Sequence, residues 1–180
     1  MDALPVVVRR HLVVELVRNL NETGSWSGAT HVQKCMFFLE HMLNVPAGYD
    51  FVIYYYGPFS FDLDRDLVLL QSRGWLTAKR EASYGVHYRP GPRAPQPRPD
   101  VGDHAWRSLR SVAELFGGKG VKDLELMATT YYVYKGLDGR TRGEAEAVSV
   151  VRQLKPHLSE DAIRSAWREL QRIEQRLARG

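Results

Sequence analysis

The side chains that could support catalysis do not fall at the spacings that catalysis or metal binding needs. His31 and His41 are ten residues apart, and the chain has neither a His-x-x-x-His nor a Cys-x-x-Cys pair. The acidic run from Asp62 imitates a calcium loop, but Leu67 stands where that loop needs glycine. We therefore expect no catalytic residue, no metal and no cofactor. An enzyme stays open as the least favoured class, because catalytic groups are recognised in space rather than in sequence.

Cations gather in a stretch that alternates like a β-hairpin, and contact with phosphate is the chemistry they suit. Lys79, Arg80 and Arg89 lie in this stretch. Residues 79–110 carry 7 basic and 3 acidic side chains, whereas residues 1–78 carry 6 and 8. Each phosphate that a cation neutralises releases counterions, so these residues predict salt-sensitive binding of a polyanion. Cations on an edge strand also block aggregation, and we give the two interpretations equal weight.

The segment before these cations combines aromatic side chains with an acidic helix. The aromatic residues could form an exposed patch that docks a protein, although alternate residues of a strand could instead fill the core. Aspartates at the start of the helix would be repelled by a phosphodiester surface, which makes this helix a poor reader of a DNA groove. The candidate partner-binding residues are Tyr54, Tyr56, Phe59, Asp62, Arg65 and Asp66.

Helices and short strands alternate in the first half of the chain. Apolar spacing predicts a helix from Leu4 to about Asn21. A second helix is predicted from Thr30, where Thr30 and Gln33 match a capping box. A short strand, Phe51 to Tyr56, is stopped by Gly57-Pro58, and Ser60 caps a helix that ends at Gly74. Two strands that turn near residues 81–83 form a hairpin.

A proline-rich connector separates this half from a helical one. We predict helices over 103–116, 121–135 and 142–154, and a last helix capped by Ser159. Helix, sharp turn, helix and hairpin is the order of a winged helix. The predicted fold is thus α+β, mainly α: a winged-helix core at 1–90, a connector at 91–102 and a helical extension at 103–180 packed on the core.

Composition favours a soluble protein of the cytoplasm. Hydrophobic residues make up 44% and charged residues 26%, and no apolar run reaches the roughly 18 residues of a membrane span. The start of the chain lacks the positive region of a signal peptide. The single cysteine, Cys35, falls on an apolar helical face and fits a reducing compartment.

Several short motifs occur in a fixed order along the chain. They are Thr30-His31-Val32-Gln33-Lys34, Phe37-Phe38-Leu39, Tyr56-Gly57-Pro58-Phe59-Ser60, Leu63, Asp66-Leu67, Gly74-Trp75-Leu76, Leu124-Glu125-Leu126-Met127-Ala128-Thr129 and Leu154-Lys155-Pro156-His157-Leu158-Ser159. Together they resemble the YwgA-like proteins, which are related to the SocA-like (Panacea) antitoxin domains. This resemblance covers most of the chain and implies a winged-helix core with a helical extension and no known catalytic residues. It also implies a bacterial antitoxin or phage-defence role in which a toxin or effector is bound directly.

The leading hypothesis is a non-enzymatic winged-helix module that acts by protein–protein contact, with a toxin or effector as partner. A homodimer stays open, and no membrane partner is expected. The alternative is a regulator that binds double-stranded DNA through its basic wing. Its candidate DNA-binding residues are Lys79, Arg80, Arg89, Arg65 and Arg73.

Overall fold

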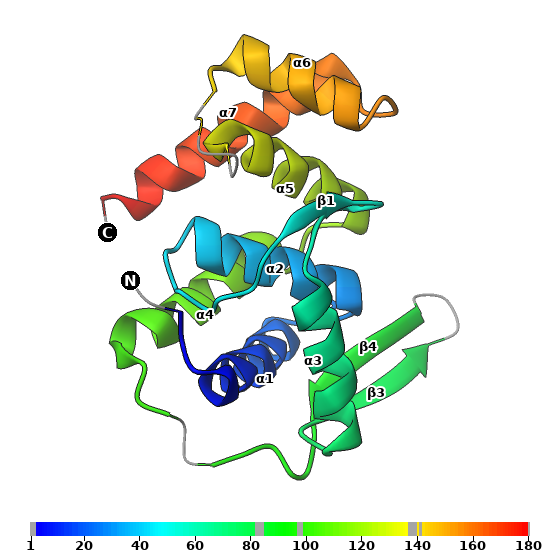
Figure 1. The fold of residues 1–180 in the computed structure, drawn as a ribbon, viewed down its shortest axis with the longest axis vertical. Coiled ribbons are helices and arrows are strands. Elements are labelled where there is room, and N and C mark those ends of the chain that lie inside the picture. The colour runs from blue at the N-terminus through cyan, green and yellow to red at the C-terminus, as the bar shows by residue number, and fades with distance from the viewer. Residues whose placement is uncertain (1–2, 82–84, 97–98, 137–139, 141, 180) are drawn as a thin grey trace. The chain divides into compact units, whose positions relative to one another are not determined.

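The computed structural model describes the chain except residues 1–2, 82–84, 97–98, 137–139, 141 and 180, and the fold is α+β and mainly helical (Figure 1). The described part holds seven helices and two pairs of short strands. The elements are α1 (Val6–Glu22), α2 (Ala29–His41), β1 (Val52–Tyr54), β2 (Gly57–Phe59), α3 (Phe61–Ser72), β3 (Leu76–Glu81), β4 (Gly85–Pro90), α4 (Gly102–Phe116), α5 (Val121–Lys135), α6 (Glu144–Leu154) and α7 (Glu160–Leu177). None of the helices in these ranges is both long and apolar enough to cross a bilayer.

The chain forms two compact units, and their boundary differs from the predicted one. Unit 1 contains Met1–Val52 and Phe59–Lys119, and unit 2 contains Ile53–Pro58 and Gly120–Gly180. Helix α4, which we expected in the C-terminal extension, packs against α1 and α2 in unit 1. The ring of Phe116 stacks on Phe38 with centroids 3.9 Å apart. The proline-rich stretch is therefore a loop within unit 1 rather than a connector between units.

The start of α2 corrects the predicted capping box. The helix begins at Ala29 with Gly28 as its N-cap residue, so Thr30 and Gln33 do not cap each other. The Gln33 side chain instead reaches Ser60: its amide nitrogen donates to the Ser60 carbonyl at 2.9 Å, and its oxygen accepts from the Ser60 N–H at 2.9 Å. The predicted cap of α3 is confirmed, since the Ser60 hydroxyl accepts from the Leu63 N–H. Gln33 thus fixes the point where α3 begins.

The hairpin of β3 and β4 is confirmed, with Thr77 opposite Arg89 and Lys79 opposite His87. Both backbone polar groups of Tyr88 bond to Ser27 in the segment before α2. The Tyr88 N–H donates to the Ser27 carbonyl, and the Ser27 hydroxyl donates to the Tyr88 carbonyl. These bonds hold β4 against the rest of unit 1.

Gly57-Pro58 does not end the strand structure as predicted. The chain turns at Tyr55 and Tyr56 and returns as β2. The turn needs a residue with positive φ, and Gly57 supplies it at 81°. A proline at the following position is tolerated because this two-stranded sheet has open edges.

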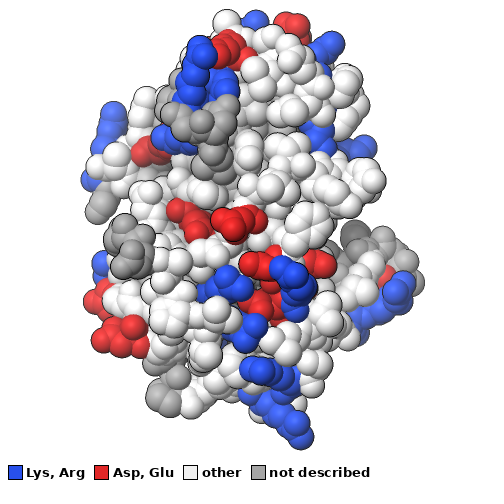
Figure 2. All heavy atoms as spheres, in the orientation of Figure 1, with Lys and Arg blue, Asp and Glu red and all other residues white. Residues whose placement is uncertain are grey.

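Asp66 is the acceptor at the centre of a buried polar cluster in unit 1. The side chain is 4% exposed, and its oxygens accept from Arg10 Nε at 2.7 Å, Tyr49 Oη at 2.9 Å and Arg9 Nε at 3.3 Å. Burial beside this carboxylate raises the pKa of the Tyr49 phenol. Its neighbour Asp62 pairs with Arg65 and lies 4.0 Å from Arg9. Acidic and basic side chains accordingly intermix on one face of the molecule (Figure 2).

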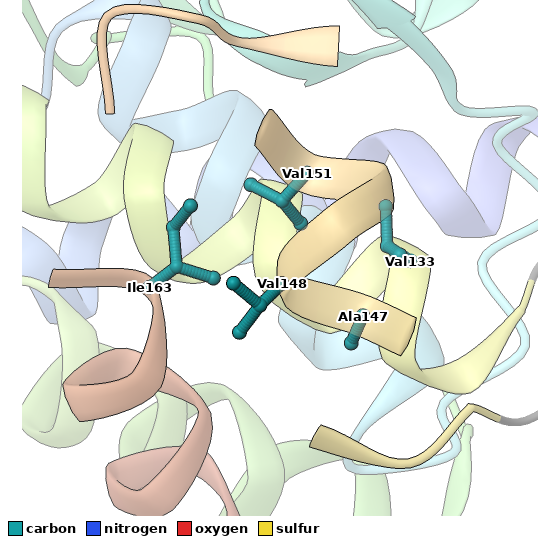
Figure 3. Close-up of a cluster of buried hydrophobic side chains, with 5 residues drawn as sticks. All are labelled: Val133, Ala147, Val148, Val151 and Ile163. Carbon is teal, nitrogen blue, oxygen red and sulfur yellow. The ribbon is translucent and has the colours of Figure 1, made fainter. Parts of the chain in front are cut away.

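Unit 2 is built on α5, α6 and α7, whose predicted positions are confirmed. The Ser159 hydroxyl caps α7 by accepting from the Ala162 N–H. Side chains from all three helices form one buried apolar cluster, made of Val133, Ala147, Val148, Val151 and Ile163 (Figure 3). This cluster gives unit 2 a hydrophobic core of its own.

Gln33→Ala is predicted to lower the free energy of unfolding by about 2 kcal/mol, because it leaves the buried Ser60 N–H without a partner and takes one of two donors from the Ser60 carbonyl. Urea unfolding followed by tryptophan fluorescence measures the change. Gln175→Ala, an exposed change in α7, is the control. Equal midpoints for the two variants would contradict the assigned role of Gln33.

His41 predicts a loss of stability in mild acid. It packs against Phe37 and Phe51, with ring centroids 4.9 and 5.7 Å away, and burial lowers its pKa to about 4. The unfolded chain therefore binds this proton at higher pH than the folded one. The stabilisation is complete above about pH 6.5 and is lost as pH falls towards 4, by about 2 kcal/mol after allowance for partial exposure.

The test compares urea unfolding at about pH 7 and pH 4.5 for the wild type, His41→Phe and His157→Gln. His41→Phe should lose less stability on acidification than the wild type, whereas His157→Gln, which removes an exposed imidazole, should follow the wild type. A His41→Phe variant with the full wild-type pH dependence would refute the assignment.

Candidate functional site

Three consecutive tyrosines project from the turn between β1 and β2. Tyr54, Tyr55 and Tyr56 are 44%, 74% and 62% exposed, and the first two rings contact each other with centroids 4.5 Å apart. We call these three residues the tyrosine turn. Their exposure decides between the two readings of the sequence, since Tyr54 and Tyr56 do not fill the core. A side chain of this size is normally buried unless it has a surface role.

The backbone of the tyrosine turn is held by a buried lysine. Lys155 Nζ donates to the Tyr54 carbonyl at 2.9 Å and to the Tyr55 carbonyl, and it lies 3.1 Å from Glu125 Oε1. The two carbonyls accept hydrogen bonds from the ammonium, and the carboxylate contributes an ion pair. Lys155 is only 6% exposed, so its charge is removed from water and each of these contacts is needed to offset the cost.

Glu125 lies close to two side chains, Lys155 and His157. Its Oε1 atom also lies 3.5 Å from His157 Nε2, and the imidazole is mostly exposed while the carboxylate is buried. Glu125 comes from α5, whereas Lys155 and His157 come from the loop between α6 and α7. This polar cluster therefore joins three separate stretches of unit 2: the tyrosine turn, α5 and that loop.

Gly57 lets the turn lie directly on α5. A Cβ atom at this position would stand 2.6 Å from Thr129 Oγ1, which is closer than van der Waals contact allows. The absence of a side chain, together with the φ of 81°, makes glycine necessary here for two separate reasons. The backbone after the tyrosines thus packs directly against α5.

Further exposed apolar side chains flank the anchoring lysine. Leu154 is 44% exposed, and Pro156 is exposed as well. Both are chain neighbours of Lys155, whose ammonium contacts the turn. We call Tyr54, Tyr55, Tyr56, Leu154 and Pro156 the tyrosine patch. It combines large amphipathic rings with aliphatic neighbours, a composition that is common at macromolecular interfaces.

The predicted partner-binding residues do not form one set. Tyr54 and Tyr56 belong to unit 2, whereas Phe59, Asp62, Arg65 and Asp66 belong to unit 1. Phe59 is half-buried, and its ring contacts Phe61 with centroids 5.1 Å apart. The prediction that Asp66 binds a partner is wrong, because its carboxylate is buried and already accepts from two arginines and a tyrosine. Arg65 and Asp62 lie at the surface but contact each other.

The outward face of α3 was missed. Phe61 and Val68 are 52% and 63% exposed, and Arg65 lies between them at helical spacing. The signal was present in the sequence, because both apolar residues fall outside the inward stripe of Leu63, Leu67 and Leu70. Lys155 and Glu125 were missed for another reason: nothing local marks a pair 30 residues apart in the sequence as partners.

The predicted DNA-binding residues all belong to unit 1. Arg73, Arg80 and Arg89 are exposed, and no ion pair is found for them within the described ranges. Lys79 Nζ lies 3.7 Å from Glu81, and Arg65 pairs with Asp62. Two of the five predicted cations are therefore partly neutralised.

Comparison with known proteins adds no assignment, since neither models of protein families nor curated proteins match this chain. The chemistry of the site consequently rests on its own geometry. A buried lysine in contact with two carbonyls and a carboxylate is fully occupied, so it is an anchor rather than a nucleophile. The exposed tyrosines are the groups that remain available to a partner.

A double-mutant cycle tests the anchor. Lys155→Met is predicted to destabilise unit 2 by about 3 kcal/mol or more, because it leaves the Glu125 carboxylate buried without its closest cation. Glu125→Leu should be similarly harmful, and the double variant should lose less than the sum, with a coupling energy above about 1 kcal/mol.

The matched control is the exposed pair Arg110–Glu114 in α4, whose atoms are 3.0 Å apart. Its cycle should give less than about 0.5 kcal/mol, as exposed helix pairs do. Urea unfolding of each variant supplies the free energies. A Lys155–Glu125 coupling no larger than that of the control pair would show that the buried cluster does not act as an anchor.

Proposed function

We propose that this protein is a non-enzymatic binding module that acts by protein–protein contact, and that the tyrosine patch is its contact surface. The observation that supports the proposal most directly is the combination of three exposed tyrosines with a fixed backbone. Tyrosine and tryptophan contribute much of the energy at protein interfaces, and a tyrosine has only two χ angles to immobilise. A turn already held by Lys155 loses little further freedom on binding.

The order of elements in unit 1 supports a winged-helix interpretation. Helix α2 is followed by the β1–β2 strand pair, by α3 and then by the β3–β4 hairpin, which would be the wing. Together with the resemblance to the YwgA-like and SocA-like (Panacea) proteins, we propose an antitoxin-like or phage-defence accessory role. The partner would then be a toxin or effector of the same bacterial cell.

The surface of α3 favours protein contact over reading of DNA bases. A helix that reads a groove presents polar side chains to base edges. Here Phe61 and Val68 are the exposed side chains on either side of Arg65. Of the three aspartates of α3, Asp66 is buried and Asp62 is paired with Arg65, whereas Asp64 is exposed. Apolar exposure therefore adds to the acidic repulsion that makes α3 a poor groove reader.

The proposal is tested by replacing the tyrosine turn in the full chain. The variant Tyr54→Ser/Tyr55→Ser/Tyr56→Ser and the wild type are each used to capture partners from the native host. A partner identified with the wild type is then purified and titrated calorimetrically. The triple change should weaken binding at least thirtyfold, which corresponds to about 2 kcal/mol for one lost hot-spot residue.

Val6→Ser/Val7→Ser is the control, because it removes exposed apolar side chains from α1 in unit 1 instead. It should bind like the wild type. Sedimentation of the protein alone shows whether a second copy is the partner, in which case the triple variant should be monomeric at concentrations where the wild type dimerises. Unchanged affinity in the triple variant, or the repeated absence of any protein partner, would overturn the proposal.

A further inference from the structure

We infer that the protein has a second binding site, located in unit 1. This site contacts the phosphate backbone of double-stranded DNA through Arg73, Arg89 and Arg93. These three arginines, called the arginine cluster below, lie at the base of the β3–β4 hairpin. The inference is independent of the proposed protein contact, because the tyrosine patch belongs to unit 2. It revises the predicted DNA-binding set by adding Arg93 and by omitting three residues. Lys79 and Arg65 have acidic partners, and Arg80 lies towards the other end of the hairpin, opposite Val86.

Most other arginines of unit 1 have an acidic partner, whereas the cluster, like Arg80, has none within the described residues. Arg9 and Arg10 contact Asp66, Arg18 contacts Glu15, and Arg110 contacts Glu114. Arg73, Arg89 and Arg93 are all exposed, and no carboxylate lies within ion-pair distance of them in the described part of the chain. Lysine and arginine side chains gather where α3 ends and on the hairpin (Figure 2). Their charge is therefore available to an external anion.

The backbone brings the three arginines together from different segments. Arg73 ends α3, and the following residue, Gly74, accepts a hydrogen bond from the Arg93 N–H at 3.0 Å. The Arg93 side chain lies against Gly74, with its Cδ 3.3 Å from where a Cβ would stand. Arg89 lies opposite Thr77 in the sheet, and Thr77 follows Gly74 by three residues in the chain. The cluster is a product of the fold rather than of sequence proximity.

A glycine maintains this arrangement. The Gly91 N–H donates to the Trp75 carbonyl at 2.7 Å, and any Cβ at residue 91 would overlap the Gly74 carbonyl. The loop after β4 can therefore lie close against the start of β3, which places Arg93 beside Arg73. A side chain at residue 91 would push the two arginines apart.

The surroundings of the cluster favour duplex nucleic acid over a protein. Its exposed neighbours Thr77, Lys79 and Pro92 include no large apolar side chain, whereas a protein interface needs an apolar centre. Interfaces with DNA are more polar and far more positive. Guanidinium groups also match phosphate geometry in two-point contacts.

Single strands fit less well, because they are bound by stacking of bases on exposed aromatic rings. In the described residues of the hairpin, His87 and Tyr88 are buried, and nearby Trp75 is half-buried against His11 with ring centroids 5.3 Å apart. The cluster thus presents charge without a stacking platform, and the apolar α3 face adds no base contacts. We expect binding that is sensitive to salt and indifferent to sequence.

The experiment measures fluorescence anisotropy of a labelled mixed-sequence duplex of about 24 base pairs at salt concentrations from about 50 to 200 mM. The wild type is compared with Arg73→Gln/Arg89→Gln/Arg93→Gln. Each lost phosphate contact should reduce the slope of log K against log salt by about 0.9, and affinity near 0.1 M salt should fall on the order of a hundredfold.

Arg172→Gln/Arg176→Gln/Arg179→Gln is the matched control, because it removes the same charge from exposed residues of unit 2. It should retain nearly all of the binding and the slope. Circular dichroism verifies that both variants are folded. Three results would each overturn the inference: no salt-dependent binding by the wild type, equal losses in the two variants, or tighter binding of a single strand or of an acidic polypeptide than of the duplex.

Discussion

The presentation of the tyrosines depends on the contacts of the buried Lys155 ammonium. It donates hydrogen bonds to two main-chain carbonyls of the turn itself and forms an ion pair with the Glu125 carboxylate. A buried lysine without them would be strongly disfavoured. The same contacts that compensate the charge therefore fix the conformation of the turn. Stability of unit 2 and display of an apolar surface are two consequences of one cluster.

Unit 1 uses charge in a complementary way. Asp66 is buried and accepts from Arg9, Arg10 and Tyr49, so this carboxylate of α3 makes internal contacts only. The outer side of the helix is left to Phe61 and Val68. The arginines at the hairpin base have no such internal partner. Unit 1 thus neutralises Asp66 in its interior and leaves the arginines of the hairpin base exposed, while unit 2 exposes aromatic rings.

Helix caps and strand alternation were predictable from the sequence, whereas contacts between residues far apart in the chain were not. The caps at Ser60 and Ser159 and the hairpin alternation depend on neighbours within a few residues, so their patterns are visible in the chain. Gln33 matched a local capping pattern yet bonds to Ser60, 27 residues away. The carbonyls of Tyr54 and Tyr55 are held by Lys155, about 100 residues later, and the buried Asp66 is paired with arginines more than 50 residues earlier. These partners have no signature in spacing.

The interleaving of the two units sets an order of events during synthesis. Tyr55 leaves the ribosome 100 residues before Lys155, the residue that holds its carbonyl. At a typical rate of about 5–20 residues per second, this interval is roughly 5–20 s. Throughout it, the nascent chain carries three consecutive tyrosines whose turn has no anchor and whose seat on α5 does not yet exist. The segment best suited to bind a partner is thus exposed to the cell well before it acquires its final shape.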